Sequence, residues 1–537
     1  MLGKFVDKIL HEEESLVEKK RKPKRKKEKG TWLIAFILFI LAFLPRLYFI
    51  YFVSNPDNPG AGWFGDAYHH WQIAYLTREV GLSHGFLRLW DLKGMEYFWG
   101  LLHPLFTLLA FAISGSISIG VERAMTAFMG SISVFLIFLL GRKYWNNKVG
   151  IAASLFAALN PVGVFNDGTG MVEPIGIPFL LLSLYLWPNK PFLAGTSLVI
   201  ALTARAEYWV FSIGILFAML ILSGKKVHFD HKMMLFIGFL IPLVLYMKYL
   251  LDYTGNPIYP FYWNYVTNIF GTWQLKPVLT LEDIQARFIF RVILAVTVLL
   301  VFLVLRKKPR GKYLYLLGLG NWIFLGATFG LGAYIKSYMS YVWYVRFMIL
   351  PYAFLGVLFA VFLFWIIPRI RYIKFIHKLY FNWIVFFTVL LAIQPVWLLI
   401  WGRYAKTQPA WEATIKIADN IAGHYKEGGL LFVEGNPEIT YALVKYHNLE
   451  GKNIIGQMFD PYFYIEGDAY ENWGENREKI LNWIKGNNIR TIATYVQSER
   501  YSKLVEYESE YFSESVGIPD SNIVIYQVDE KLYRDEI

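Results

Sequence analysis

The sequence contains no cysteine among its 537 residues. This absence excludes disulfide bonds, thiolate nucleophiles, and zinc or iron–sulfur centres held by cysteine. Charged residues are also scarce: they make up 18% of the chain, against roughly 25% in soluble domains. Hydrophobic residues supply 56%, and they come in long blocks that a water-facing surface could not accommodate. The composition therefore excludes a fully soluble enzyme and predicts a protein embedded mostly in lipid.

The net charge of +12 is unevenly distributed along the chain. Residues 404–537 hold 13 Lys and Arg against 22 Asp and Glu, a net charge of −9, so the residues before them carry +21. Lys and Arg concentrate in the cytoplasmic loops of membrane proteins. The distribution therefore favours a topology signal over nucleic-acid binding, and we expect no nucleic-acid partner.

Apolar runs of the length that a span needs, about 17 to 25 residues, predict about eleven transmembrane helices. The run at 99–114 is also short and begins with a His-Pro break, so we expect a helix that packs in the outer loop. The predicted spans lie at 31–53, 122–141, 149–166, 171–187, 191–206, 208–223, 233–251, 288–305, 313–332, 347–367 and 380–402.

Alternate loops between these spans are basic, which predicts their orientation. The runs at 19–29 and 306–312 fall on the same side, so we expect a cytoplasmic N-terminus and an extracytoplasmic tail. Three parts follow: a basic amphipathic head at 1–30 that contacts anionic lipids, a transmembrane domain at 31–403, and a soluble domain at 404–537. The expected location is the cell membrane.

The tail has the pattern of a compact α/β domain. Helical stretches near 410–425, 436–447, 476–487 and 498–510 alternate with strand-like runs at 429–433, 489–496 and 522–528. No Gly-rich phosphate loop follows any of these runs. We therefore expect a lid or recognition module rather than a nucleotide-binding domain.

Ionisable residues at the ends of spans are costly, and several lie on the predicted outer side. In the first outer loop, Asp66 is followed at helical spacing by His69 and His70. A carboxylate there could accept a proton from a hydroxyl group, with a histidine tuning or replacing it. The alternative is that Asp66 caps a helix and that the histidines are interfacial polar residues.

A second outer loop, FNDGTGMVEP, holds Asp167 and Glu173. An acidic residue just before a proline suits the first turn of a helix, where the helix dipole favours it in any case. Two carboxylates facing Asp66 would nevertheless form a cavity able to hold a cation or activate an acceptor. If a divalent cation such as Mg²⁺ or Mn²⁺ is required, the candidate ligands are Asp66, Asp167 and His69.

Two arginines in later outer loops are candidates for binding phosphate, because a guanidinium group matches phosphate oxygens with two donors. Arg205 lies with Glu207 in a hairpin between two short spans, where the two side chains could instead pair with each other. Arg346 begins a late span. Tyr259, in an aromatic loop, is a candidate substrate contact, although aromatic residues at interfaces ordinarily serve as anchors.

The order of these motifs resembles the GT-C superfamily of membrane glycosyltransferases. It runs from GDAYHH through an HPLF helix, a GMVEP turn, LTARAE and GNPIYPF to an Arg-led late span, and covers residues 31 to about 400. The resemblance implies an inverting transferase that moves a sugar from a polyprenyl-phosphate carrier to a lipid, glycan or protein acceptor at the outer face. It also implies Asp66 as the base, Glu173 or Asp167 as the second acid, and Arg205 and Arg346 near the sugar phosphate and carrier phosphate.

Two alternatives remain open. An oligosaccharyltransferase has a similar first loop, but the tail here lacks the WWDYG signature of that family and the second loop lacks a DxD-like pair. A transporter or flippase of lipid-linked sugars is the rival from another class. Such proteins usually have internal repeats and paired, interrupted helices at the bilayer midplane, whereas here the ionisable groups gather on one face and no repeat is apparent.

Overall fold

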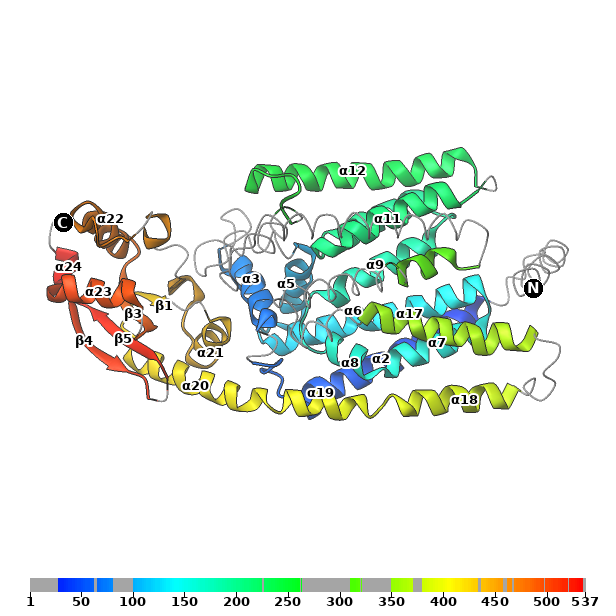
Figure 1. Ribbon diagram of the computed structural model, residues 1–537, viewed down its shortest axis with the longest axis horizontal. Coiled ribbons are helices and arrows are strands. Elements are labelled where there is room, and N and C mark those ends of the chain that lie inside the picture. Colours follow the sequence, from blue (N-terminus) through cyan, green and yellow to red (C-terminus); the bar gives the residue numbers. More distant parts are fainter. Residues whose placement is uncertain are drawn as a thin grey trace, which may run out of the picture.

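The computed structural model describes residues 28–61, 65–80, 100–224, 227–260, 262, 310–318, 320, 349–369, 379–432, 436–456, 461–465, 468–496, 498–519 and 521–534. Within these residues the chain forms a body of helices and a smaller domain built on a sheet (Figure 1). A long helical run along one edge of the molecule joins the two. The predicted fold class, a helical membrane domain followed by a soluble α/β domain, is confirmed.

The helical body is apolar enough to span a membrane. By length and hydropathy, four described helices qualify: Gly30–Val53, Ile119–Tyr144, Phe229–Thr254 and Phe381–His424. A bent pair gives a fifth, and shorter apolar helices pack around them. The predicted span at 288–305 and most of that at 313–332 lie outside the described residues. In chain order the elements of the body are α2 (Glu28–Tyr48), η2 (Phe49–Val53), α3 (Asp66–Val80), α5 (Leu102–Ser114), α6 (Ile119–Tyr144), α7 (Asn147–Leu159), α8 (Pro161–Asp167), α9 (Glu173–Leu186), α10 (Pro191–Leu202), α11 (Ala206–Leu222), α12 (Phe229–Thr254), α17 (Ile349–Val361), η5 (Phe362–Ile366), η6 (Ile367–Arg369), α18 (Leu379–Ala392) and α19 (Val396–Tyr404).

One predicted span, 149–166, is not a single straight helix. It divides into α7 and α8, which meet at an angle of 62°. Pro161 lacks the N–H that a continuous helix would need, but it fits the first position of a new one. The Asn160 side chain accepts a hydrogen bond from Val162 N at 3.0 Å and so caps α8. This break turns the end of α8, with Asp167, into the body.

Small residues allow the helices to approach closely, as is common in membranes. A methyl group at Gly141 of α6 would lie 2.7 Å from Gly150 Cα of α7. Likewise, a methyl group at Gly195 of α10 would lie 2.3 Å from Leu235 O of α12. Other faces of α12 carry exposed apolar side chains, including Phe229 and Leu245. These faces suit contact with lipid.

The C-terminal domain contains a five-stranded sheet in the order β2-β1-β3-β5-β4. Strand β1 is parallel to β2 and β3, whereas β5 is antiparallel to β3 and β4. Strands β1, β3 and β5 match the three predicted runs, while the short β2 and the polar β4 were not predicted. The elements are α20 (Thr407–His424), β1 (Gly429–Phe432), α21 (Pro437–His447), η7 (Gly451–Asn453), β2 (Ile454–Gly456), η9 (Pro461–Tyr464), α22 (Trp473–Gly486), β3 (Ile489–Tyr495), α23 (Glu499–Tyr507), η10 (Ser509–Tyr511), β4 (Phe512–Gly517), β5 (Ile523–Val528) and α24 (Glu530–Arg534).

Candidate functional site

Loops far apart in the sequence meet at the end of the helical body that faces the C-terminal domain. Gly170, in the turn before α9, has a φ of +79°, and a methyl group there would lie 3.4 Å from Glu122 Oε1 and 3.7 Å from Ala67 Cβ. Leu102 N donates a hydrogen bond to Thr203 O at 3.3 Å. The starts of α3, α5 and α6 therefore gather beside the turn before α9 and the hairpin before α11. These are the loops that hold most of the predicted site residues.

Asp66 is the first residue of α3, and His69 lies close to it on the same helix. The His69 ring nitrogen Nδ1 lies 3.1 Å from Gln72 Oε1. Burial lowers the pKa of His69, although Asp66 and Gln72 partly offset this effect. His70 instead turns inward, is 1% exposed, and packs its ring 5.0 Å from that of His103. The structure thus separates the two predicted histidines, leaving His69 beside Asp66.

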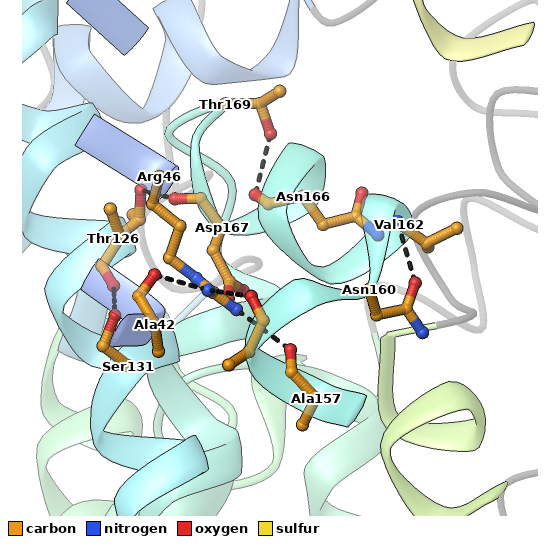
Figure 2. A network of polar contacts seen from close by, with 12 residues as sticks. Ala42, Arg46, Thr126, Ser131, Ala157, Asn160, Val162, Asn166, Asp167 and Thr169 are labelled. Carbon is orange, nitrogen blue, oxygen red and sulfur yellow. Dashed lines mark hydrogen bonds and ion pairs between the residues drawn. The ribbon is translucent and has the colours of Figure 1, made fainter. Parts of the chain in front are cut away.

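Asp167 is held by an arginine inside the body (Figure 2). Arg46 Nε of α2 donates to Asp167 Oδ2 at 2.7 Å, and the two side chains are 1% and 3% exposed. The same guanidinium group donates to the carbonyl oxygens of Ala42 at 2.7 Å and Ala158 at 3.1 Å. The carboxylate also lies against Gly130 of α6, where a methyl group would approach Oδ2 to 2.1 Å. Asp167 therefore joins α2, α6 and α8.

Glu173 binds Arg205 in a second buried cluster. Arg205 Nη1 donates to Glu173 Oε1 at 2.8 Å, and Arg205 Nε donates to Glu207 Oε2 at 2.7 Å. The Tyr208 hydroxyl group donates to Glu173 O at 2.7 Å and fixes the start of α9. The alternative to phosphate binding, a pairing of Arg205 with Glu207, is thus observed in the structure, and Glu173 is a second partner of Arg205. One guanidinium group between two carboxylates gives this cluster a formal net charge of −1.

A third buried group, His103 with Glu122, is not among the predicted site residues. His103 Nε2 lies 3.5 Å from Glu122 Oε1, and both side chains are fully buried.

Next to Glu122, Arg123 donates from Nε to Gly168 O at 2.8 Å and from Nη1 to Asn55 O at 2.6 Å. Arg46 and Arg123 both lie within apolar helices, where ionisable groups are costly. That cost was the signal in the sequence that could have identified Arg46 and Arg123 as residues of the site.

The remaining predicted residues are placed as follows. Tyr259 follows α12, is half-buried against the apolar core, and its N donates to Asn256 O at 3.2 Å. Arg346 lies outside the described residues. Within the described part of the chain, no three His, Asp or Glu side chains gather in a way that could hold a metal ion. Because Asp167 binds Arg46, the predicted ligand set of Asp66, Asp167 and His69 does not assemble as a metal site here.

No family model and no curated protein matches the sequence. Solved structures do match. ArnT from Cupriavidus metallidurans, in the apo state, is 10% identical with a TM-score of 0.51, over 94% of this chain and 98% of that one. The same protein bound to undecaprenyl phosphate is 11% identical with a TM-score of 0.50, over 94% and 99%. The oligosaccharyltransferase AglB from Archaeoglobus fulgidus, in complex with an inhibitory peptide and a dolichol-phosphate, is 11% identical with a TM-score of 0.46, over 95% and 75%.

The likeness to ArnT covers the helical body and the C-terminal domain together. At this identity it establishes the fold and no more. The chain therefore has the fold of ArnT, and the apolar helices of its body are those of a polytopic membrane protein.

Proposed function

We propose that this protein is a membrane glycosyltransferase that takes a sugar from a polyprenyl-phosphate carrier and places it on an acceptor at the outer membrane face. The main support is the convergence of loops that brings Asp66, the Glu173–Arg205–Glu207 cluster and the His103–Glu122 pair to one end of a GT-C fold. We further propose that the N-terminus is cytoplasmic and that residues 404–537 form an extracytoplasmic domain, as the charge distribution predicts.

Asp66 is the best candidate for the base. Asp167 and Glu173 each bind an arginine at 2.7 to 2.8 Å, which holds both carboxylates in structural pairs. Asp66 opens α3 beside His69 and is partly exposed, so an acceptor can approach it. In the proposed reaction Asp66 accepts the proton of the acceptor hydroxyl group as that oxygen attacks the sugar C1. The bond from C1 to the phosphate oxygen breaks, its electron pair leaves with the phosphate, and C1 is inverted.

The departing phosphate needs positive charge or hydrogen-bond donors. Arg205 can supply them if a phosphate oxygen takes the place of Glu207, because Glu207 is the more exposed of its two partners, at 19% against 5% for Glu173. Arg346 remains a predicted contact of the carrier phosphate. A requirement for Mg²⁺ or Mn²⁺ also remains a prediction, and a chelator tests it directly.

The test is transfer by purified protein in nanodiscs supplied with polyprenyl-phosphate sugars and a panel of lipid, glycan and peptide acceptors. Release of polyprenyl phosphate that depends on an acceptor is the expected result. Asp66→Asn should lower turnover by about 10²-fold or more, in the range of acid–base groups. Asp252→Asn is the matched control, since Asp252 is an exposed residue that pairs with Lys248 on α12.

Two results would contradict these assignments. Turnover of Asp66→Asn at the level of the unmodified protein removes Asp66 as the base. Failure of every carrier and acceptor to give release, in protein that remains folded, removes the transferase function and favours a transporter or flippase.

A further inference from the structure

The loop that leads to α3, residues 54–61, is held by helices from distant parts of the chain. Arg123 of α6 donates from Nη2 to Ser54 Oγ at 2.7 Å. Tyr404, at the end of α19, donates from its hydroxyl group to Asn58 O at 2.6 Å and accepts from Asn55 N at 3.1 Å. The loop before Asp66 is thus fastened both to the helical body and to the run of helices that leads into the C-terminal domain.

The C-terminal domain binds the same loop through hydrogen bonds to Asp57. The hydroxyl groups of Tyr441 and Tyr446, both on α21, donate to Asp57 Oδ1 at 2.5 Å and Oδ2 at 2.7 Å. Ser118 Oγ adds a bond to Oδ1 at 3.0 Å. Burial and the neighbouring Asp57 carboxylate raise the pKa of Tyr441 and Tyr446, so both phenols keep the protons that they donate. Hydrogen bonds to an ionised acceptor are the strong ones.

Helix α3 itself packs on the C-terminal domain. The Trp71 ring meets Tyr441 edge to face at a centroid distance of 4.7 Å, and Tyr68 stacks on Trp411 of α20 at 5.8 Å. The Tyr68 hydroxyl group donates to Asp57 O at 2.8 Å, and this hydrogen bond links α3 to the loop at residues 54–61. Further along α3, the Tyr75 hydroxyl group accepts a hydrogen bond from Gly451 N at 3.3 Å. One face of α3 is therefore in contact with the C-terminal domain from Tyr68 to Tyr75.

We propose that the C-terminal domain is a structural part of the active site, in which Asp57, Tyr441 and Tyr446 are positioning residues that hold α3 and so aim Asp66. We call these three residues the Asp57 latch. The catalytic consequence rests on the proposed function, whereas the positioning of α3 does not. A base works only within hydrogen-bond reach of the proton that it accepts. A misplacement of about 1 Å can cost about 10²-fold in rate.

The absence of cysteine makes the latch directly testable, because introduced cysteines are the only sites that a spin label can modify. One label pair, at Arg78 of α3 and Lys416 of α20, measures the distance between α3 and the C-terminal domain in nanodiscs. A second pair, at Lys416 and Asn482 of α22, lies wholly within the C-terminal domain and reports whether that domain stays folded. All three positions are labelled in the full-length protein, two at a time.

The latch is opened by Tyr441→Phe with Tyr446→Phe, or by Asp57→Ala. The matched control is Tyr425→Phe, because the Tyr425 hydroxyl group bonds to Gly428 O within the C-terminal domain. We expect the latch variants to broaden the 78–416 distance distribution, leave the 416–482 distribution narrow, and lower kcat by about 10- to 100-fold. KM for the carrier should change little, and the control should resemble the unmodified protein in every measurement.

The outcomes separate the two proposals. An unchanged 78–416 distribution in the latch variants overturns the latch. Broadening without any fall in kcat overturns the positioning of Asp66. If the unmodified protein transfers no sugar, the transferase proposal fails, and the label distances alone still decide whether the latch holds α3.

Discussion

Replacing Arg46 with methionine should sharply destabilise this protein. Arg46 and Asp167 are 1% and 3% exposed, and the guanidinium group supplies the Asp167 carboxylate with a charge partner at 2.7 Å. Methionine fills similar space but leaves the carboxylate buried without that partner, and it also removes the side-chain donor to the carbonyl oxygens of Ala42 and Ala158. Removal of one member of a buried ion pair costs about 3–5 kcal/mol. We expect Arg46→Met to lower the free energy of unfolding by that amount.

A second substitution makes the prediction specific to the pair. Arg46→Met with Asp167→Asn removes the uncompensated charge, so it should regain about 2 kcal/mol relative to Arg46→Met alone. Unfolding by SDS in mixed micelles, followed through the fluorescence of the 19 tryptophans, measures the unmodified protein and both variants. A loss below about 1 kcal/mol for Arg46→Met would refute the reasoning from burial. So would a double variant less stable than Arg46→Met.

The same double variant also tests the role predicted for Asp167. If the carboxylate acts only in holding α2, α6 and α8 together, transfer activity should return along with stability. If it also takes part in the reaction, stability should return while activity stays low.

Two further predictions concern the packing and pairing of the site. Gly130→Ala should cost about 1–3 kcal/mol, because its methyl group would overlap the fixed Asp167 carboxylate. Gly402→Ala is the control, with nothing within 4 Å of the added carbon, and equal stabilities in the SDS titration would contradict the prediction. Arg205→Lys should cost about 1–3 kcal/mol, because an ammonium group lacks the planar fork that bonds Glu173 and Glu207 from two sides. A fully stable lysine variant in the same titration would show that the fork is dispensable.

The sequence by itself determined the class of this protein and the position of most of its elements. Long apolar runs in the first part of the chain indicate membrane spans, and short strand-like apolar runs in the tail suffice to place β1, β3 and β5, because both depend on residues that are neighbours in the chain. The break at Pro161 was also visible locally, although the span that contains it was predicted as one helix. Asp66 as the first residue of α3 follows from the same local pattern.

Only the tertiary structure decided which charges meet. Asp167 lies 121 positions from Arg46, and Asp57 lies 384 positions from Tyr441, so no local pattern could pair them. Asp167 and Glu173, which were predicted as candidate catalytic acids, each form an ion pair with an arginine. The C-terminal domain forms hydrogen bonds with Asp57 in the loop before Asp66. The physical reason is that a buried charge must find a partner wherever the packed helices bring one within reach. Helix packing over the whole chain sets that choice, whereas hydropathy sets only which segments enter the membrane.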